Sequence, residues 1–252
     1  MNASGEHVLT TWVLPVDVDE ASAVVAAWAG EGAGRVVCAA NVHMVMEAWD
    51  DPAFAEALAS ADLVVCDGRP LVWSCRLQGV NDARQTRGMD LMIEVCRLAA
   101  RRGLRVGLYG AEPQLREAVG RRLSRLSPGL EIAYSWSPPF RALSPEEDDA
   151  VVDAIVSAGV QILLVSLGCP KQEWWMIAHR DRLPCVAMGV GGAFGMLGGT
   201  VRVAPRWVQR LGLEWLYRLT AEPRRLWRRY SRHNGRFTVL ALRQALDLRL
   251  RG

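Results

Sequence analysis

The sequence predicts an α/β fold, in which a Rossmann-like parallel sheet carries helices on both faces and a basic helical appendage follows at the C-terminus. Six short runs are rich in β-branched or other apolar residues, and segments with helical periodicity lie between them. Strands that are buried on both sides, each followed by a helix, are typical of a parallel sheet covered on both faces. A concentration of arginine after residue 200 predicts the basic appendage.

The apolar runs are rich in β-branched or other apolar residues, and each is short enough for one strand. The predicted strands are Val36–Ala39, Leu63–Cys66, Val106–Tyr109, Ile132–Trp136, Ile162–Ser166 and Val186–Gly189. Periodicity predicts helices over Leu91–Ala100 and Leu115–Leu126. A capping box with proline at the first helical position, Ser144-Pro-Glu-Glu147, opens another helix. We expect residues 1–200 to form the α/β domain and residues 201–252 the appendage.

Composition indicates a folded protein with reduced thiols. Half of the 252 residues are apolar and 23% are charged, which is usual for a globular chain. The six cysteines lie nine or more residues apart and form no CxxC pair, so we expect mostly buried, reduced thiols of a cytosolic protein. Met1–Pro15 does not resemble a signal peptide. The uncharged stretches Ala154–Pro170 and Leu183–Val201 contain glycines and strand patterns, so we expect no transmembrane helix.

The net charge of +3 conceals a division along the chain. Thirteen arginines and three acidic residues lie between Arg202 and Gly252, so this segment carries +10 and the remainder carries −7. An acidic body with a basic tail predicts an anionic partner: a membrane surface, a nucleic acid or a polyanionic ligand. Lys171 is the only lysine among the 30 basic residues.

Polar or glycine-rich segments follow five of the predicted strands. These segments are Asn41-Val-His43, Asp67-Gly68, Gly107-Leu-Tyr-Gly110, Leu167-Gly-Cys-Pro-Lys-Gln-Glu173 and Gly189-Val-Gly-Gly-Ala-Phe194. Open parallel sheets bind ligands at the carboxyl ends of their strands. The recurrence of such segments therefore predicts a small-ligand site at this edge of the sheet.

Each of the first three polar residues has a functional and a purely structural interpretation. Asp67, between an apolar strand and Gly68, is a candidate general base, although on composition alone an Asp-Gly turn is the favoured interpretation. Asn41 could orient a substrate hydroxyl or cap the helix that follows. His43 lies in an apolar stretch, where a structural histidine is the simpler interpretation than a catalytic one.

The later segments suit a phosphate-bearing ligand. A helix that begins with Lys171, Gln172 and Glu173 after a glycine and a proline suits a diphosphate, although a plain helix start would look the same. Gly191 and Gly192 suggest a dinucleotide fingerprint, but a phenylalanine stands in place of the third glycine. No Walker A motif, metal-spaced Cys/His cluster or G-x-S-x-G elbow is present, so the sequence predicts neither metal nor serine-triad chemistry.

The order of these motifs resembles one protein family, the WecG/TagA/CpsF glycosyltransferases, over about residues 30–235. The resemblance rests on the segments just described and on Gly88-Met-Asp90, Ser137-Pro-Pro-Phe140, Arg202-Val-Ala-Pro-Arg-Trp207, Gly212-Leu-Glu-Trp-Leu-Tyr-Arg-Leu219 and Glu222-Pro-Arg-Arg-Leu-Trp-Arg-Arg-Tyr230. Two positions depart from the family pattern. Ala39 stands where a threonine is frequent, and Gly195 stands where an aspartate usually follows the Ala-Phe pair.

The resemblance implies an enzyme that transfers a sugar, with inversion and without a metal or other cofactor. The donor is a UDP-sugar and the acceptor is an undecaprenyl-diphosphate-linked sugar, at the cytoplasmic face of the plasma membrane. Members of the family contribute to teichoic acid, common antigen, capsule or exopolysaccharide synthesis, and the motif variants here look most like the exopolysaccharide members. The sequence does not identify the sugar, the linkage or the oligomeric state.

The resemblance also implies roles for individual residues. Asp67 corresponds to the proposed base, and Gln172 and Asn41 complete the candidate catalytic group. The candidate donor-binding residues are Gly110, Pro170, Lys171, Glu173, Gly191 and Gly192, together with Arg224 and Arg228 of the appendage, of which one would close over the diphosphate. The candidate acceptor-binding residues are Asn41, His43, Gly88 and Asp90.

The appendage itself predicts contact with a membrane. Trp207, Leu211, Trp215 and Leu219 recur every fourth residue, so on one helix they form an apolar stripe beside arginines, as in an interfacial helix. Packing of this stripe on the body or on a second subunit is the alternative. Other functions compatible with these patterns are a Rossmann-type nucleotide-binding protein or oxidoreductase, and a non-catalytic polyanion-binding protein. We expect no nucleic-acid partner, because no recognised nucleic-acid module is present.

Overall fold

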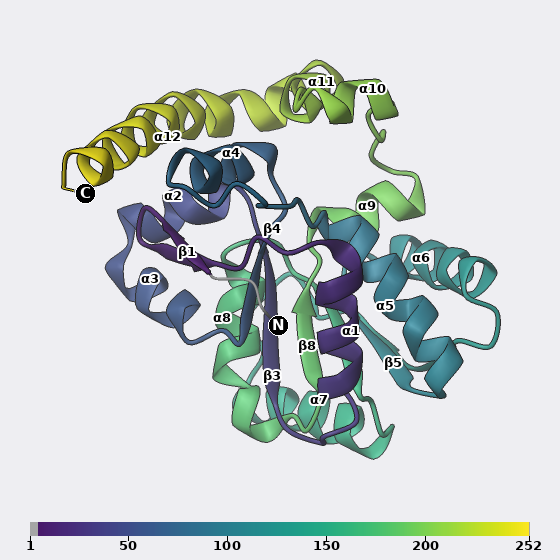
Figure 1. Ribbon diagram of the computed structural model, residues 1–252. Coiled ribbons are helices and arrows are strands. Elements are labelled where there is room, and N and C mark those ends of the chain that lie inside the picture. The colour runs from purple at the N-terminus through teal and green to yellow at the C-terminus, as the bar shows by residue number, and fades with distance from the viewer. Residues whose placement is uncertain (1–4, 252) are drawn as a thin grey trace.

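The computed structural model describes residues 5–251, except for the side chains of Arg210, Arg225, Arg229 and Arg251. At the centre of this described part is a six-stranded parallel sheet with the strand order β4-β3-β8-β7-β5-β6 (Figure 1). Its strands are β3 (Arg35–Ala40), β4 (Leu63–Cys66), β5 (Arg105–Gly110), β6 (Glu131–Trp136), β7 (Ile162–Ser166) and β8 (Val186–Gly189). All six predicted strands, and the α/β fold class, are confirmed.

Helices cover both faces of the sheet, as predicted, and each face has its own buried core. One face is covered by α1 (Val18–Trp28), α5 (Gly88–Arg102), α6 (Pro113–Leu126) and α9 (Gly192–Gly198). The other face is covered by α2 (Val42–Asp50), α3 (Pro52–Ala59), α7 (Pro145–Ser157) and α8 (Lys171–Ala178). Successive residues of β3 divide between the two cores, because side chains alternate across a strand: Val36 and Cys38 lie in one core and Val37 in the other.

The described residues begin with a hairpin that the sequence did not predict. Its strands β1 (Glu6–Val8) and β2 (Thr11–Val13) are antiparallel and three residues long. Leu9 in the turn has a φ of 56°, a left-handed conformation for which no glycine or asparagine is present as a signal. The backbone N–H of Leu14 donates to the carbonyl of Val64 at 2.7 Å, and this contact joins the hairpin to the edge of the main sheet.

Three C-terminal helices lie across the carboxyl ends of β3 and β4, above α4 (Arg69–Leu77) in Figure 1. They are α10 (Arg206–Arg210), α11 (Glu214–Ala221) and α12 (Pro223–Arg251). The expectation of a single helix bearing the tryptophan stripe is wrong, because the chain breaks between α10 and α11. Gly212 adopts a left-handed φ of 71° at this break, and a Cβ there would lie 2.7 Å from the Trp73 ring.

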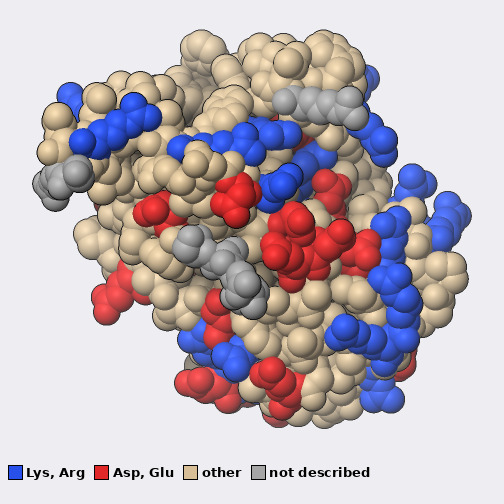
Figure 2. Space-filling model, viewed as in Figure 1, with Lys and Arg blue, Asp and Glu red and all other residues tan. Residues whose placement is uncertain are grey.

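The long helix α12 packs against α2 and α4 and contributes to the core. Phe237 and Ala241 are buried in the same apolar cluster as β3 and α2. The division of the chain near residue 200 therefore stays a prediction. Figure 2 shows arginines along the C-terminal helices at the top of the view and a group of acidic side chains on the body below them, in line with the charge division of the sequence.

The cysteines, the capping box and the question of a membrane-spanning helix can be compared with the sequence expectations. None of the six cysteines forms a disulfide; five are buried and Cys169 is half-buried. The capping box at the start of α7 is present, with the Glu147 N–H donating to the Ser144 hydroxyl and the Glu147 carboxylate accepting from the Ser144 N–H. Along the described residues, no helix combines the length and the apolar character needed to cross a membrane.

Candidate active site

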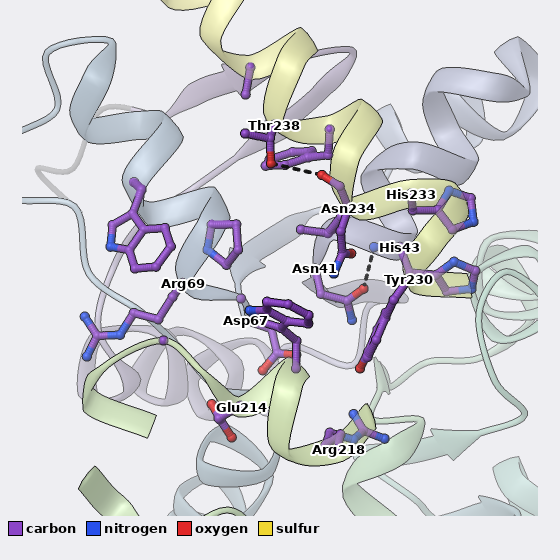
Figure 3. A pocket seen from close by; sticks show the side chains of 18 of the residues that line it. Asn41, His43, Asp67, Arg69, Glu214, Arg218, Tyr230, His233, Asn234 and Thr238 are labelled. Atoms are coloured by element: carbon purple, nitrogen blue, oxygen red, sulfur yellow. Dashed lines mark hydrogen bonds between the residues drawn. The ribbon is translucent and has the colours of Figure 1, made fainter. Parts of the chain in front are cut away.

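A cavity of about 520 Å³ lies where α4, α11 and α12 meet the carboxyl ends of β3 and β4. One end of the cavity is polar and the other is apolar. The polar end is lined by Asn41, Asp67, Arg69, Arg87, Glu214 and Arg218. The other end, between α4 and α12, is largely apolar and is lined by Trp73, Leu77, Phe237, Ala241 and Leu242, with Asn234 and Thr238 also reaching it from α12. Figure 3 shows Asn41 and Asp67 near the centre of this space, with Glu214 and Arg218 of α11 below them in the view.

Asp67 immediately follows β4 and is held in place by several hydrogen bonds. Its Oδ1 accepts the backbone N–H of Gly88 at 2.8 Å, and its carbonyl accepts the Gln85 side-chain amide at 2.6 Å. Burial raises the pKa of the Asp67 carboxyl, while the Gly88 hydrogen bond, the charges of Arg87 and Arg218 and a hydrogen bond from Asn41 act in the opposite direction. A partly desolvated carboxylate at the wall of a cavity has the chemistry of a general base.

Asn41 fulfils the structural role that the sequence allowed and also faces the cavity. It caps α2, because its side-chain oxygen accepts the backbone N–H groups of His43 and Met44 at 3.0 and 3.3 Å. It also lines the polar end beside Asp67. His43, two residues after Asn41, lines the same cavity. The structure thus brings together three predicted residues: Asn41, His43 and Asp67.

The remaining predicted acceptor residues lie beside this group. Gly88 is buried and holds the Asp67 carboxylate through its N–H; a Cβ at this glycine would lie 3.3 Å from that of Ala39. Asp90 is half-buried, and its carboxylate lies 3.5 Å from the Arg87 guanidinium. Neither Gly88 nor Asp90 is among the described residues that line the cavity.

Three arginines and a glutamate complete the polar end, and the sequence analysis did not assign them to the site. Arg87 donates to Gln209 at 2.6 Å and to Glu214 at 2.7 Å, so it ties the body to α10 and α11. Burial raises the pKa of Glu214, and the nearby negative charge of Asp67 raises it further. A sequence signal did exist for Glu214, because it interrupts a row of arginines between Arg202 and Arg218.

The candidate donor residues form a second group at the ends of β5, β7 and β8. Gln172 and Glu173 are buried, and the Gln172 amide donates to the Glu173 carboxylate at 2.7 Å. The Gln172 side chain lies against the backbone of β8, where a Cβ at Gly189 would be 2.9 Å from its Nε2. Burial also raises the pKa of the Glu173 carboxyl. Both side chains are buried, and neither is among the described residues that line the cavity.

The other candidate donor residues surround the same strand ends. Ser166, at the end of β7, donates its hydroxyl to the Gly191 carbonyl at 3.0 Å, and a Cβ at Gly110 would lie 2.4 Å from the Ser166 carbonyl oxygen. Pro170 is half-buried, and Lys171 and Gly192 are exposed. A Cβ at Gly192 would lie 3.6 Å from the Arg218 guanidinium, so Arg218 lies between the donor group and the cavity.

The structure gives a reason for the glycine at position 195. Gly195 is buried, and a Cβ there would lie 2.8 Å from the Val201 side chain. An aspartate would therefore need Val201 to shift. Arg224 and Arg228 are exposed on α12 and are not among the described residues that line the cavity. Their predicted contact with a donor diphosphate stays a prediction.

Comparison with known proteins identifies the family. Residues 6–251 match the glycosyl transferase WecG/TagA/CpsF family. A Bacillus spizizenii protein named N-acetylglucosaminyldiphosphoundecaprenol N-acetyl-β-D-mannosaminyltransferase is 33% identical over 197 residues, which cover 78% of this chain and 74% of that protein. A Bacillus subtilis protein of the same name is 32% identical over 199 residues, 78% of this chain and 75% of its own length. The chain belongs to the WecG/TagA/CpsF family of glycosyltransferases.

Proposed function

We propose that this glycosyltransferase moves a sugar from a UDP-sugar to an undecaprenyl-diphosphate-linked sugar, with inversion and without a metal, in the synthesis of a bacterial exopolysaccharide or other cell-surface polysaccharide. The cavity is the observation that carries the proposal. Its polar end holds a carboxylate among arginines, and its apolar end lies between α4 and α12. A lipid-linked sugar diphosphate has the same division, because a charged head is joined to a hydrocarbon chain.

The proposed reaction is a single displacement. Asp67 takes the proton of the acceptor hydroxyl, and the acceptor oxygen forms a bond to the anomeric carbon of the donor sugar. The bond from that carbon to the UDP oxygen breaks, and UDP leaves with the bonding pair. The developing charge on the diphosphate is stabilised by cationic groups near the reacting atoms. Arg218 is suited to this role because it lies between the cavity and the donor group.

The donor is proposed to bind along the ends of β5, β7 and β8. Exposed Gly192 allows close approach of a ligand to the backbone there, and Lys171 at the start of α8 provides a cation. Gly110 and Gly191 shape this region differently, because the space that their side chains would fill is taken by Ser166 and Gln172. The buried Gln172 and Glu173 then support the wall of this region instead of reaching into the cavity. Arg224 or Arg228 of α12 would contribute to the diphosphate only once the enzyme docks on its acceptor.

The C-terminal helices are proposed to hold the enzyme on the inner face of the plasma membrane. Trp207 and Trp227 are 64% and 63% exposed, and exposed arginines accompany them on the same helices. Tryptophan with arginine is typical of a surface that lies in a lipid headgroup region. Each arginine near an anionic leaflet contributes about 1 kcal/mol, so several together suffice for peripheral binding.

A donor and acceptor panel tests the proposed function. The names of the relatives make UDP-N-acetylmannosamine the first donor and N-acetylglucosaminyldiphosphoundecaprenol the first acceptor to try. Mass spectrometry should detect an acceptor extended by one sugar with release of UDP. Calorimetry with UDP, NAD and an oligonucleotide provides the second arm: the proposal expects UDP to bind. Binding of NAD or the oligonucleotide without UDP would instead support the oxidoreductase or polyanion-binding alternatives.

A further inference from the structure

Two histidines and a glutamate meet at the wall of the cavity, on two helices that are far apart in the sequence. His43 and Glu47 lie one turn apart on α2, so their side chains lie on one face of that helix. His233 comes from α12 and is 3% exposed. The Nδ1 of His43 is 3.5 Å from Oε1 of Glu47, and the Nε2 of His233 is 3.4 Å from the same oxygen. All three potential ligand atoms lie within 4.8 Å of one another.

We propose that His43, Glu47 and His233 bind one divalent transition-metal ion of the zinc class, which fastens α12 to α2. With metal–ligand bonds of about 2.0–2.1 Å, two ligand atoms of a tetrahedral site are roughly 3.4 Å apart. The two nitrogen–oxygen distances match that spacing. The imidazole rings have their centroids 5.3 Å apart and are tilted by 56°, so they are not stacked face to face.

The ligand set selects the class of metal. Imidazole nitrogens suit zinc, copper, nickel and iron, whereas calcium and magnesium require mainly oxygen ligands. Both histidines also line the cavity, so a water molecule could fill a fourth position from that side. Three protein ligands and one water form a common arrangement for zinc.

The arginines of α12 that lie near this cluster contact Asp50 and not Glu47. Asp50, one turn further along α2, is occupied by Arg236 at 2.7 Å and lies 3.5 Å from Arg232. These two arginines of α12 thus have their own carboxylate partner. A bound ion would add a second tie between the same two helices and so would fix the α12 wall of the cavity. This role is structural, and the transfer chemistry proposed for Asp67 does not depend on it.

Cobalt titration of the full-length protein tests the site. The chain is first freed of metal with EDTA, and Co²⁺ is then added while the visible absorption of tetrahedral cobalt is recorded. We expect one equivalent of Co²⁺ to bind and Zn²⁺ to displace it. His43→Gln and His233→Gln should each weaken binding by at least about tenfold, since they remove a direct ligand. His7→Gln removes an exposed histidine of the hairpin and should bind like the wild type.

Thermal unfolding provides a second readout and guards against misfolded variants. Zn²⁺ at a hundredfold excess over its Kd should raise the melting temperature of the wild type by about 5–10 °C. Circular dichroism identifies variants that are folded, and His43, whose side chain is 16% exposed, is less buried than His233. Absence of tetrahedral cobalt bands, or equal Co²⁺ binding by the wild type and both variants, overturns the proposal. Neither readout uses glycosyl transfer, so failure here is distinguishable from failure of the proposed function.

Discussion

The Arg87 guanidinium binds the Glu214 carboxylate at 2.7 Å, and this contact joins the body of the protein to its C-terminal helices. Both side chains are largely shielded, with 14% and 24% of their surfaces exposed. Arg87 precedes α5 beside the Asp67 site, whereas Glu214 begins α11. The pair therefore positions the helix that carries Arg218 over the candidate base.

Arg87→Ala should destabilise the protein and the site together. The change leaves Glu214 and Gln209 without their donor, which we expect to lower the free energy of unfolding by about 1–3 kcal/mol. Chemical denaturation measures this loss. Arg121→Ala is the matched control, because its pair with Glu117 is 65% and 64% exposed and such pairs contribute little. Equal losses for the two variants would contradict the account of this contact.

Asp67→Asn should stabilise the protein at neutral pH. Burial raises the pKa of Asp67 above 3.8, so between that value and its raised pKa the folded chain holds more protons than the unfolded chain. The free energy of unfolding therefore falls as pH rises through this window, and the whole penalty is present above it. Asparagine removes the penalty while keeping an oxygen for the Gly88 N–H.

Melting temperatures at several pH values check this expectation. The advantage of Asp67→Asn over the wild type should be largest near pH 7 and should shrink as the pH falls toward 4. Asp153→Asn changes an exposed aspartate of α7 and serves as the control. An Asp67→Asn variant that is less stable than the wild type at pH 7 would show that burial does not dominate at this carboxyl.

The sheet was predictable because most of its strands are buried on both faces. Apolar runs such as Ile162–Val165 in β7 are characteristic of such strands, and the order of motifs placed Asp67 and Asn41 at the ends of two of them. The first hairpin was not predictable from its turn, because Leu9 takes a left-handed conformation without the usual glycine or asparagine. Gly212 did signal the break between α10 and α11. The regular spacing of apolar residues at every fourth position nevertheless favoured one continuous helix.

The rest of the site depends on long-range packing. Arg218, Glu214 and the α12 residues reach Asp67 only because the C-terminal helices fold back over α4. Local sequence patterns do not predict that the C-terminal helices pack over α4. The same applies to His233, which lies about 190 positions from His43 along the chain and yet shares a ring contact with it.

Trp73→Ala should impair use of a lipid-linked acceptor more than use of a short one. Trp73 lines the apolar end of the cavity and is 45% exposed, so its ring is available to a hydrocarbon chain. We expect KM to rise by about tenfold for an undecaprenyl acceptor, since burying an aliphatic chain against one aromatic ring contributes about 1–2 kcal/mol. Steady-state kinetics with undecaprenyl and short-alkyl acceptors make the comparison.

The control for this experiment is Trp12→Ala. Trp12 is 49% exposed on the hairpin and is not among the described residues that line the cavity. Its kinetics should match those of the wild type with both acceptors. If Trp73→Ala raised KM equally for long and short acceptors, the apolar end would not be the lipid site.

Binding to anionic vesicles should depend on the arginines of α12. A double variant, Arg224→Glu with Arg228→Glu, reverses two exposed charges and should weaken vesicle sedimentation strongly. Binding of the wild type should also weaken with added salt, because exposed charges are screened over about 8 Å at physiological ionic strength. Arg101→Glu with Arg102→Glu, at the exposed end of α5, is the control. Equal sedimentation of both double variants would place the membrane contact elsewhere.

The role of Asp67 is tested most directly by the turnover of Asp67→Asn with a UDP-sugar and a lipid-linked acceptor, measured beside its affinity for UDP. General-base catalysis contributes about 10²–10⁴ in rate, so we expect turnover to fall by that factor. UDP affinity should stay at the wild-type value, because the donor is proposed to bind at the ends of β5, β7 and β8. Turnover near the wild-type rate would contradict the assignment of Asp67 as the base and, with it, the proposed mechanism.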